Sequence, residues 1–417
     1  MSIPGPCRRP AFAKKRARAN GSFPLQGGRL GWGLNVCRPP FHPLPNPSCR
    51  PHPGLQAGTA LRARRARLET PASPPGRGRE QSRWAKTVLF LVSRLEACRA
   101  TALALVWGLC SGLAAAQGVA FVSSEKDHAL SIIDLATLSV TGTIPTCKRP
   151  RHLQLSADKK QLMVACGESN VADIIDLATR KSVRHLPLGD DPEAFDLSPD
   201  GKTLYVSSED EGALTFIDVA SGKVIRKTEV GKEPEGVKVS PDGKIVWVTS
   251  EVASLVHVIS TLDGKVLKNV KVGKRPRRFA LTPDGSQLWV SNELGASVTI
   301  LSTADYSTLA TLKFELKGAR DSDITPVGIT MTRDGKRAFV ALGRANHVAF
   351  VDVLSRKVTD LVLVGKRAWN VSLDKAEKRL LVVNGLSDDV TVVDVASAKA
   401  IKTIAVGRVP YAALVVD

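Results

Sequence analysis

The chain has 417 residues, with 59 Lys and Arg against 40 Asp and Glu and a formal net charge of +19. Residues 1–116 hold 19 of the basic residues and three acidic ones, which leaves 40 basic and 37 acidic residues in 117–417. This second part lacks the basic excess with which a nucleic-acid-binding protein neutralises phosphates. Its 301 residues are enough for a large hydrophobic core.

Residues 1–91 form a basic segment rich in Pro and Arg, and 14 of the 25 prolines of the chain precede residue 76. Such a composition cannot bury enough apolar area to offset the entropy of ordering, so we expect disorder. Two interpretations stay open for this segment. It is upstream sequence translated from a wrongly assigned start, which we favour, or a basic arm for a nucleic acid or a membrane surface.

Residues 92–116 have the anatomy of a secretory signal peptide. Arg94 and Arg99 precede an apolar run at 102–113, and three small residues end at Ala116. The apolar run is too short to span a bilayer, so we expect cleavage near Ala116, export to the periplasm and no membrane span. The alternative is a buried helix.

Residues 117–417 repeat themselves with a period of 42 residues. A Gly-x-x-Pro segment recurs at steps of 42, 42, 42, 50, 42 and 42, at the positions Pro150, Pro192, Pro234, Pro276, Pro326, Ala368 and Pro410; Cys147 and Asp323 replace the Gly in two copies, and Ala368 replaces the Pro in one. An apolar doublet followed by small polar residues runs in step, as in AFVSS from Ala120 and LYVSS from Leu204. Repeats near 40 residues that contain only strands predict a β-propeller.

Each repeat has four short segments of alternating polarity, separated by turns such as Pro-Asp-Gly at 199–201. Seven copies of the apolar doublet predict seven blades. The chain enters at a second strand and ends at 410–416 with a first strand, so the C-terminal strand should complete the N-terminal blade. The sequence therefore predicts an all-β, seven-bladed β-propeller over 117–417, with its open edges paired.

The repeat LYVSSEDEGALTFIDVASGKVIRKTEVGKEPEGVKVSPDGK resembles the YVTN family of seven-bladed β-propellers. Within that family, TCKRPRHLQLSADKKQLMVACGES after a signal peptide is similar to periplasmic propellers associated with catabolism that depends on pyrroloquinoline quinone (PQQ). The resemblance implies an exported binding or scaffold protein that acts beside a PQQ-dependent alcohol or aldehyde oxidation system. It specifies the fold strongly and the function weakly, because propellers host unrelated activities.

In such a blade the strand that follows the Gly-x-x-Pro segment is innermost, so residues around each Pro should gather at the mouth of the central channel. We predict that this mouth binds a partner or ligand, with Trp369 and Tyr411 as an apolar anchor. The charged and polar residues expected there are Arg149, Arg151, His152, Asp191, Glu193, Glu233, Glu235, Arg275, Arg277 and Arg367. The alternative is that the charges form exposed ion pairs with a structural role; we expect Arg275 and Arg277 to be exposed.

The step of 50 residues marks an insertion before Pro326, whose charged tips are Asp321 and Asp323. A loop added to a rigid scaffold is a place for function, although neutral variation in length would look the same. A glutamate recurs at the end of the second strand, and the four copies are Glu125, Glu209, Glu251 and Glu293. Carboxylates one blade apart rarely converge on one ion, so we predict no metal site.

Seven cysteines fall to two, Cys147 and Cys166, once the signal peptide is removed. Export and an even count are compatible with a disulfide at one end of one hairpin, and also with two free thiols.

The sequence favours a non-enzymatic protein without a cofactor. Histidines are scattered without metal-ligand spacing, and no GxSxG or CxxCH motif occurs. The docking Trp expected in PQQ-binding blades is missing. We expect a monomer whose partner is a periplasmic dehydrogenase, a cytochrome or a small metabolite. The alternative is a propeller enzyme, either a lactonase-type hydrolase or a quinoprotein-related oxidoreductase, that uses Glu193 and Glu235 with His152.

Overall fold

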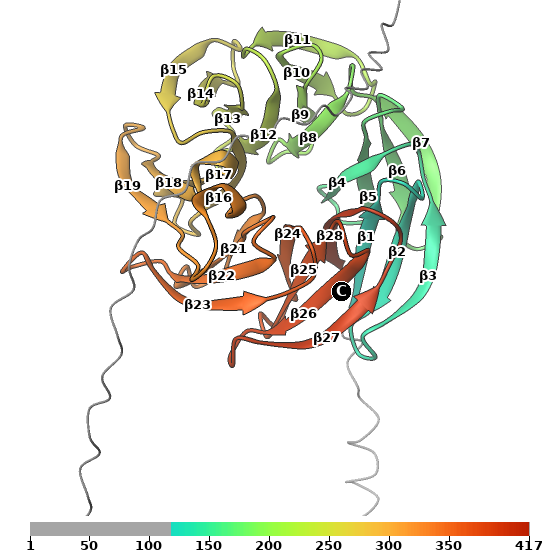
Figure 1. Ribbon diagram of the computed structural model, residues 1–417. Helices are drawn as coiled ribbons and strands as arrows, with labels where there is room; N and C mark the ends of the chain where they lie inside the picture. Colours follow the sequence, from blue (N-terminus) through green and yellow to red (C-terminus); the bar gives the residue numbers. More distant parts are fainter. Residues whose placement is uncertain (1–117, 417) are drawn as a thin grey trace, which may run out of the picture. The chain divides into compact units, whose positions relative to one another are not determined.

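The structure, a computed structural model, describes residues 118–416; the segments interpreted above at 1–91 and 92–116 lie outside them. The described chain forms 28 strands in seven antiparallel sheets of four strands, arranged as blades around a ring (Figure 1). The predicted seven-bladed β-propeller is therefore confirmed.

The first four blades, with strands given from the channel outward, follow the chain with one exception at the start. Blade 1 consists of β28 (Pro410–Val416), β1 (Val119–Ser124), β2 (Ala129–Asp134) and β3 (Ser139–Pro145). Blade 2 consists of β4 (Pro150–Leu155), β5 (Gln161–Cys166), β6 (Val171–Asp176) and β7 (Lys181–Pro187). Blade 3 consists of β8 (Pro192–Leu197), β9 (Thr203–Ser208), β10 (Ala213–Asp218) and β11 (Val224–Glu229). Blade 4 consists of β12 (Pro234–Val239), β13 (Ile245–Ser250), β14 (Leu255–Ser260) and β15 (Val266–Lys271).

The last three blades include two short 3₁₀ helices. Blade 5 consists of β16 (Pro276–Leu281), β17 (Gln287–Asn292), β18 (Ser297–Ser302) and β19 (Thr308–Lys313), with η1 (Glu293–Gly295) between β17 and β18. The insertion carries η2 (Asp321–Asp323) and leads to blade 6, which consists of β20 (Ile329–Met331), β21 (Arg337–Ala341), β22 (His347–Asp352) and β23 (Lys357–Leu363). Blade 7 consists of β24 (Ala368–Leu373), β25 (Arg379–Asn384), β26 (Asp389–Asp394) and β27 (Lys399–Ala405).

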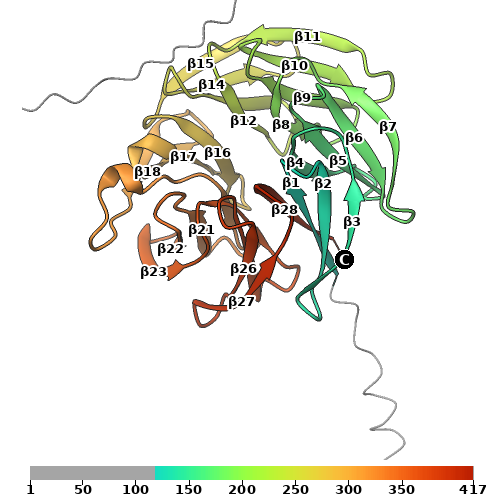
Figure 2. The same ribbon diagram turned by 45° about the vertical axis from the view of Figure 1, so that its right-hand side comes forward.

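The ring closes by pairing the two ends of the described chain. The last strand, β28, runs antiparallel to the first, β1, with Val416 opposite Val119 and Val415 opposite Ala120. The two strands lie side by side in Figures 1 and 2. This pairing, which the repeat predicted, covers the edge that β1 would otherwise expose.

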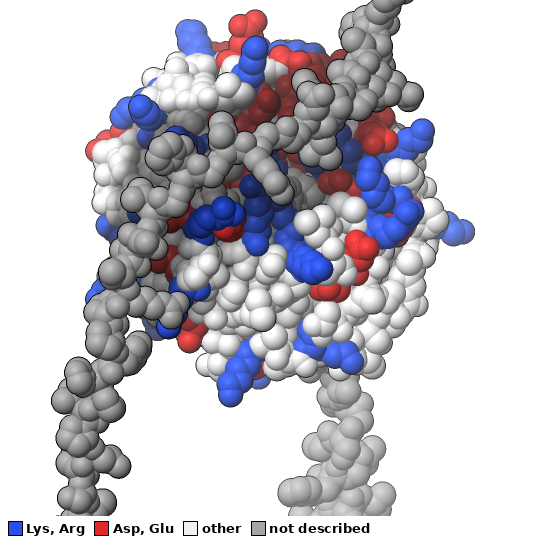
Figure 3. Space-filling model, in the orientation of Figure 1, with Lys and Arg blue, Asp and Glu red and all other residues white. Residues whose placement is uncertain are grey.

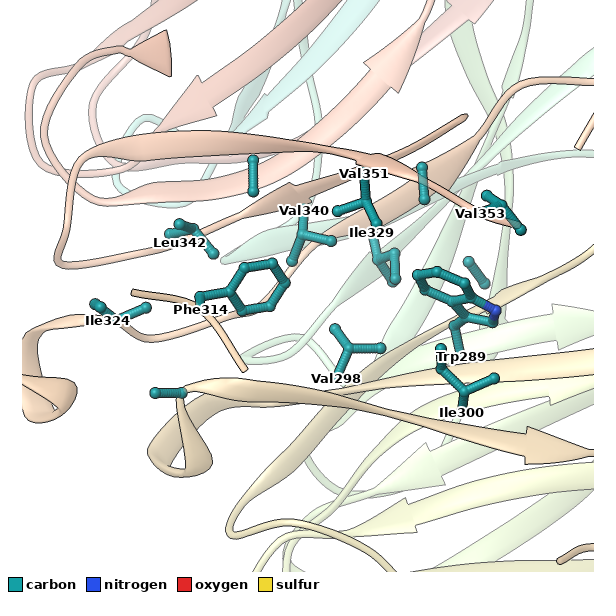
Figure 4. Packing of buried hydrophobic residues seen from close by; sticks show 14 residues of the cluster. Trp289, Val298, Ile300, Phe314, Ile324, Ile329, Val340, Leu342, Val351 and Val353 are labelled. Carbon is teal, nitrogen blue, oxygen red and sulfur yellow. The ribbon is translucent and has the colours of Figure 1, made fainter. Parts of the chain in front are cut away.

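The hydrophobic core lies between blades. The middle strands are buried over most of their length, as in β5 and β13, because a neighbouring blade covers each of their faces. Between blades 5 and 6, Trp289 is fully buried and packs in one cluster with Phe314, Val340 and Val351 (Figure 4). The outer strands, such as β7, are mostly exposed. No helix among residues 118–416 has the length and apolarity that a membrane crossing needs.

Candidate functional site

A β-bulge at the start of the inner strands directs side chains to the mouth of the channel. In β4 the register shifts between Pro150 and Leu153, so two residues of β4 lie opposite one residue of β5. The residue before the Pro is left-handed in six blades, with φ between 46° and 61°, at Arg149, Asp191, Glu233, Arg275, Arg367 and Val409. A left-handed residue followed by a bulge re-aims side chains, and it recurs at the same place around the ring.

The mouth contains a network of six arginines and six carboxylates in direct ion pairs. Its members are Arg149, Arg151, Arg275, Arg277, Arg278, Arg367, Glu125, Asp191, Glu193, Glu235, Glu251 and Glu293. Pairs between neighbouring blades include Arg149 with Asp191 at 2.9 Å and Arg277 with Glu235 at 3.3 Å. Arg151 contacts Glu193 of the next blade and Glu125 of the preceding one. The network therefore links blades, not only residues within one blade.

Three residues of this network region close the channel, and we call them the septum: Tyr411, Glu235 and Arg278. The Tyr411 hydroxyl of β28 donates to Glu235 Oε1 of β12 at 3.1 Å. Arg278 of β16 donates to the Tyr411 hydroxyl oxygen and pairs with Glu235 at 2.9 Å. Two blades separate β28 from β12 on one side, and two separate it from β16 on the other, so these contacts cross the channel.

The ion pairs of the mouth are mostly buried, which corrects the expectation of exposed pairs. Arg277 is 5% exposed, where the sequence predicted an exposed side chain, and Glu193 is fully buried. Arg275 is half-buried, with 41% of its side chain exposed. Arg277 lies below the surface because Glu235, Glu251 and Glu293 surround its guanidinium. Buried charges need such pairing, since an unpaired one would be strongly destabilising.

Burial and neighbouring charges separate the pKa values of the mouth carboxyls. Burial raises the pKa of Glu251 to about 7, although the Arg277 guanidinium favours its charged form. Burial and the charge of Glu235 raise the pKa of Glu193 well above its usual range. Burial also opposes ionisation of Glu235, but the guanidinium groups of Arg277 and Arg278 lower its pKa to about 2. Glu235 is thus held as an anion, in contrast to Glu193 and Glu251.

The two aromatic residues predicted as an anchor, Trp369 and Tyr411, meet at the mouth, and arginines cover their rings. The rings of Trp369 and Tyr411 meet edge-on at 5.6 Å. The Arg367 guanidinium lies 4.5 Å from the Trp369 ring centre, and that of Arg151 lies 4.9 Å from the Tyr411 ring centre. Both contacts are within cation–π range. With Leu386 these residues line a hollow of about 230 Å³ at the mouth.

The other predicted residues of the mouth lie outside this network. Asp321 is exposed, and Asp323 accepts from the guanidinium of Arg320, three residues away, at 2.9 Å. Glu233 lines a separate shallow depression with Glu251 and Arg275. The insertion is anchored by Phe314 and Ile324, which are buried in the cluster between blades 5 and 6. Asp323 therefore forms a local pair with Arg320, and neither Asp321 nor Asp323 extends the arginine network.

Cys147 and Cys166 form a disulfide with their Cα atoms 5.8 Å apart. The bond joins the segment before β4 to the end of β5, so it encloses Arg149 and Arg151 in a loop. Among the described blades, blade 2 alone has a cysteine in its mouth segment, and the disulfide joins that segment to β5.

Three carboxylates, Asp191, Glu193 and Glu209, lie with one oxygen each within 4.8 Å of the others. Arg149 already pairs with Asp191 and Glu193, and Arg151 pairs with Glu193. The positive charge that such a cluster attracts is therefore supplied by arginine side chains.

His152 does not share the mouth with the carboxylates, contrary to the prediction. Its ring faces a cavity of about 590 Å³ on the far side of the septum, with Gln154, Asp196, Lys238 and Asn370. Apart from His152, the sequence did not point to these residues. Their signal is positional: they lie two or four residues after the repeat Pro, on alternate positions of the inner strands.

Comparisons with known proteins agree on the fold. The profile of the YNCE-like beta-propeller family matches residues 79–179 and 168–239, and that of the lactonase, 7-bladed beta-propeller family matches residues 258–403. Each covers less than half of the chain. No curated protein matches the sequence.

Several solved structures resemble the propeller. Hydrazine synthase of Kuenenia stuttgartiensis is 24% identical with a TM-score of 0.60, over 66% of this chain and 92% of that one. The periplasmic gluconolactonase PpgL of Pseudomonas aeruginosa is 20% identical with a TM-score of 0.62, over 72% and 99%. The dihydro-haem d1 dehydrogenase NirN is 14% identical with a TM-score of 0.56, over 72% and 75%. At these identities the likeness concerns the fold alone.

Proposed function

We propose that the chain is an exported, non-enzymatic binding protein that docks a protein partner at the mouth of its propeller. The observation that carries this proposal is that the charged side chains of the mouth pair with one another. Twelve ionisable groups are held in ion pairs with one another, so they build a rigid surface. The association with PQQ-dependent alcohol or aldehyde oxidation rests on the resemblance of the repeats.

The rim of the mouth supplies the docking surface, and its two halves differ. In blades 4, 5 and 7 the loop after the second strand exposes an apolar side chain at the same position, with exposed fractions of 61%, 52% and 68% for Val252, Leu294 and Leu386. Exposed cations lie beside them and form no ion pair within the described residues; they are Lys232, Lys274, Arg344 and Lys366. An apolar centre with a basic rim fits an acidic partner surface.

The opposite half of the rim is acidic. Glu168, Asp190 and Asp210 are exposed on the loops of blades 2 and 3. In Figure 3 acidic side chains gather around the blade of β8–β11, and basic ones lie beside the centre of the ring. Such a two-sided charge pattern orients a charged partner on approach.

Export is consistent with the disulfide between Cys147 and Cys166, because such bonds persist in oxidising compartments. The predicted signal peptide lies outside the described residues. Both features support a periplasmic partner, such as a dehydrogenase or a cytochrome.

The test is charge reversal on the basic half of the rim. The chain is immobilised and exposed to periplasmic extract from cells growing on an alcohol, and bound proteins are identified by mass spectrometry. Lys274→Glu with Lys366→Glu should lose a stoichiometric partner that wild type retains, and added salt should weaken the wild-type complex. Lys244→Glu with Lys336→Glu, two exposed lysines in turns at the other end of the blades, is the matched control. Equal capture of the partner by both variants would show that the mouth is not the docking face.

A lactone hydrolase is the second candidate, because the lactonase profile matches residues 258–403. The residues first assigned to it speak against it: Glu193 and Glu235 are buried in arginine ion pairs, and His152 faces away from the mouth. Hydrolysis of a lactone by purified wild type, lost in His152→Phe, would favour the enzyme. A quinone or haem band in the visible spectrum of the purified protein would overturn the expectation of no cofactor.

A further inference from the structure

The far side of the septum holds a cavity of about 590 Å³ that the docking function does not use. It is lined by the second halves of the inner strands and by the turns that follow β4 and β8. Its volume is in the range of sites for small metabolites. Ala194 and Gly236 occupy inner-strand positions where other blades carry His152, Arg278 and Asn370, and at Gly236 the strands of blades 4 and 5 approach so closely that a Cβ would clash with the Arg277 carbonyl oxygen.

The charge that faces this cavity is predominantly positive. Lys238 and Arg278 line it from β12 and β16, and Lys159 lies exposed at its edge. Asp196 is the acidic residue of the lining and pairs with Lys238 at 3.0 Å, and Arg278 pairs with Glu235 of the septum at 2.9 Å. Burial, and then the positive charge of Arg278, lower the pKa of His152 to about 3, so the imidazole is neutral at physiological pH. A cavity with this balance attracts an anion.

Hydrogen-bonding groups remain unused inside the cavity. The Gln154 side chain donates to Asp196 Oδ1 at 2.8 Å, but its carbonyl oxygen is buried without a partner among residues 118–416. The His152 ring meets Phe195 edge-on at 4.9 Å and makes no hydrogen bond within the same residues. The carbonyl oxygen of Gln154 is therefore an acceptor that a bound molecule can use.

Part of the lining is apolar. Phe279, Ile329 and Leu414 line the same space from blades 5, 6 and 1. Ser156, Ser198 and Asn370 add polar groups. The cavity therefore combines cations, a free acceptor, a neutral imidazole and apolar carbon.

We propose that this cavity is a second site, independent of the mouth, which binds a small organic carboxylate that carries a hydroxyl group. The carboxylate lies against Lys238 and Arg278. The hydroxyl donates to the carbonyl oxygen of Gln154. The septum of Tyr411, Glu235 and Arg278 separates this site from the mouth, so ligand enters from the face where the inner strands end.

The test is calorimetric titration of the full chain at pH 7 with three probes. L-malate carries carboxylate and hydroxyl groups, succinate lacks the hydroxyl, and sorbitol lacks the carboxylate. We expect malate to bind more tightly than succinate and sorbitol not to bind. Lys238→Met, which keeps the length of the side chain and removes its charge, should weaken malate binding by about tenfold or more.

Two further variants keep the result interpretable. Lys232 lies at the mouth end of the same blade as Lys238. Lys232→Met should leave malate binding within about twofold of wild type. Gln154→Leu removes the carbonyl oxygen that accepts from the ligand hydroxyl; it should weaken malate binding and reduce the preference for malate over succinate even if Lys238→Met folds poorly. No heat with any carboxylate, equal affinity for malate and sorbitol, or loss of binding only in Lys232→Met would each overturn the proposal. Partner capture at the mouth should be unchanged in Lys238→Met, so the two proposals fail separately.

Discussion

The two ends of the central channel are built from the same seven inner strands and differ in how their polar groups are used. At the mouth, Arg277 and Glu193 are buried and each contacts at least two opposite charges. On the far side, the carbonyl oxygen of Gln154 is buried without a partner. Residues four positions after the repeat Pro also meet across adjacent blades, as Gln154 does with Asp196 and Asp196 with Lys238, but these residues line a cavity of about 590 Å³. A propeller can thus close one end of its channel with paired charge and leave a binding cavity at the other.

The largest expected effect separates two arginines of the mouth. Arg277→Met should lower the free energy of unfolding by about 3–5 kcal/mol. It removes the guanidinium that pairs with both Glu235 and Glu251, and it leaves these buried carboxyls with Arg278 and Arg275, respectively. Arg275→Met should cost about 1 kcal/mol or less, because that side chain is partly in water. Denaturant titration of both variants measures the contrast. Equal losses would mean that the two arginines are equally buried.

Removal of the disulfide should come next in size. The double variant Cys147→Ala and Cys166→Ala opens a loop with a sequence separation of 19, which should cost about 3 kcal/mol. The loop contains Arg149 and Arg151, so the mouth should also lose rigidity while the far-side cavity, built by several blades, keeps its shape. Denaturation of wild type with and without a thiol reductant is the control. An unchanged midpoint in both experiments would show that the bond adds no stability.

The septum should contribute less. Tyr411→Phe keeps the ring and removes the hydroxyl that joins Glu235 to Arg278, with an expected loss of about 1–2 kcal/mol. Tyr306→Phe is a matched control, because Tyr306 lies on the outer part of blade 5 and its hydroxyl makes no hydrogen bond within the described residues. If the two substitutions cost the same, the hydroxyl of Tyr411 does not hold the channel closed.

The smallest effect is a change of slope with pH. The pKa of Glu251 is raised from 4.5 to about 7 in the folded state, so the folded chain keeps a proton that the unfolded chain loses. The contribution of Glu251 to stability therefore falls as pH rises from about 4.5 to 7 and is constant above. Glu235 acts in the opposite sense: its pKa is lowered to about 2, and its contribution is lost as pH falls from about 4.5 to 2.

Glu251→Gln removes the titrating carboxyl and so isolates the contribution of Glu251 to the pH dependence of stability. Denaturation midpoints at pH 5, 6, 7 and 8 should decline more steeply for wild type than for the variant between pH 5 and 7. Parallel profiles over that interval would place the pKa of Glu251 outside it.

Many contacts of the mouth could be predicted from the spacing of the repeat, but the burial of its charged groups could not. Residues 42 apart occupy the same place on adjacent blades, so Arg149 with Asp191 and Arg151 with Glu193 follow from the repeat. Burial does not follow, because the depth of Arg277 depends on how closely seven inner strands approach one another. The contact between Tyr411 and Glu235 spans 176 residues and crosses the channel. The predicted position of His152 at the mouth was wrong, because His152 lines the cavity on the far side of the septum.

The blade count, the strand order within each blade and the closure by the C-terminal strand could be predicted from the amino-acid sequence. These depend on alternation, turn residues and a repeat length, all of which are local properties of the chain. Only the tertiary structure decided which charges are buried, where the channel is closed and where it is hollow. Those outcomes depend on the distance between side chains that different blades bring to one axis, and pairing or solvation of a charge changes steeply over that distance.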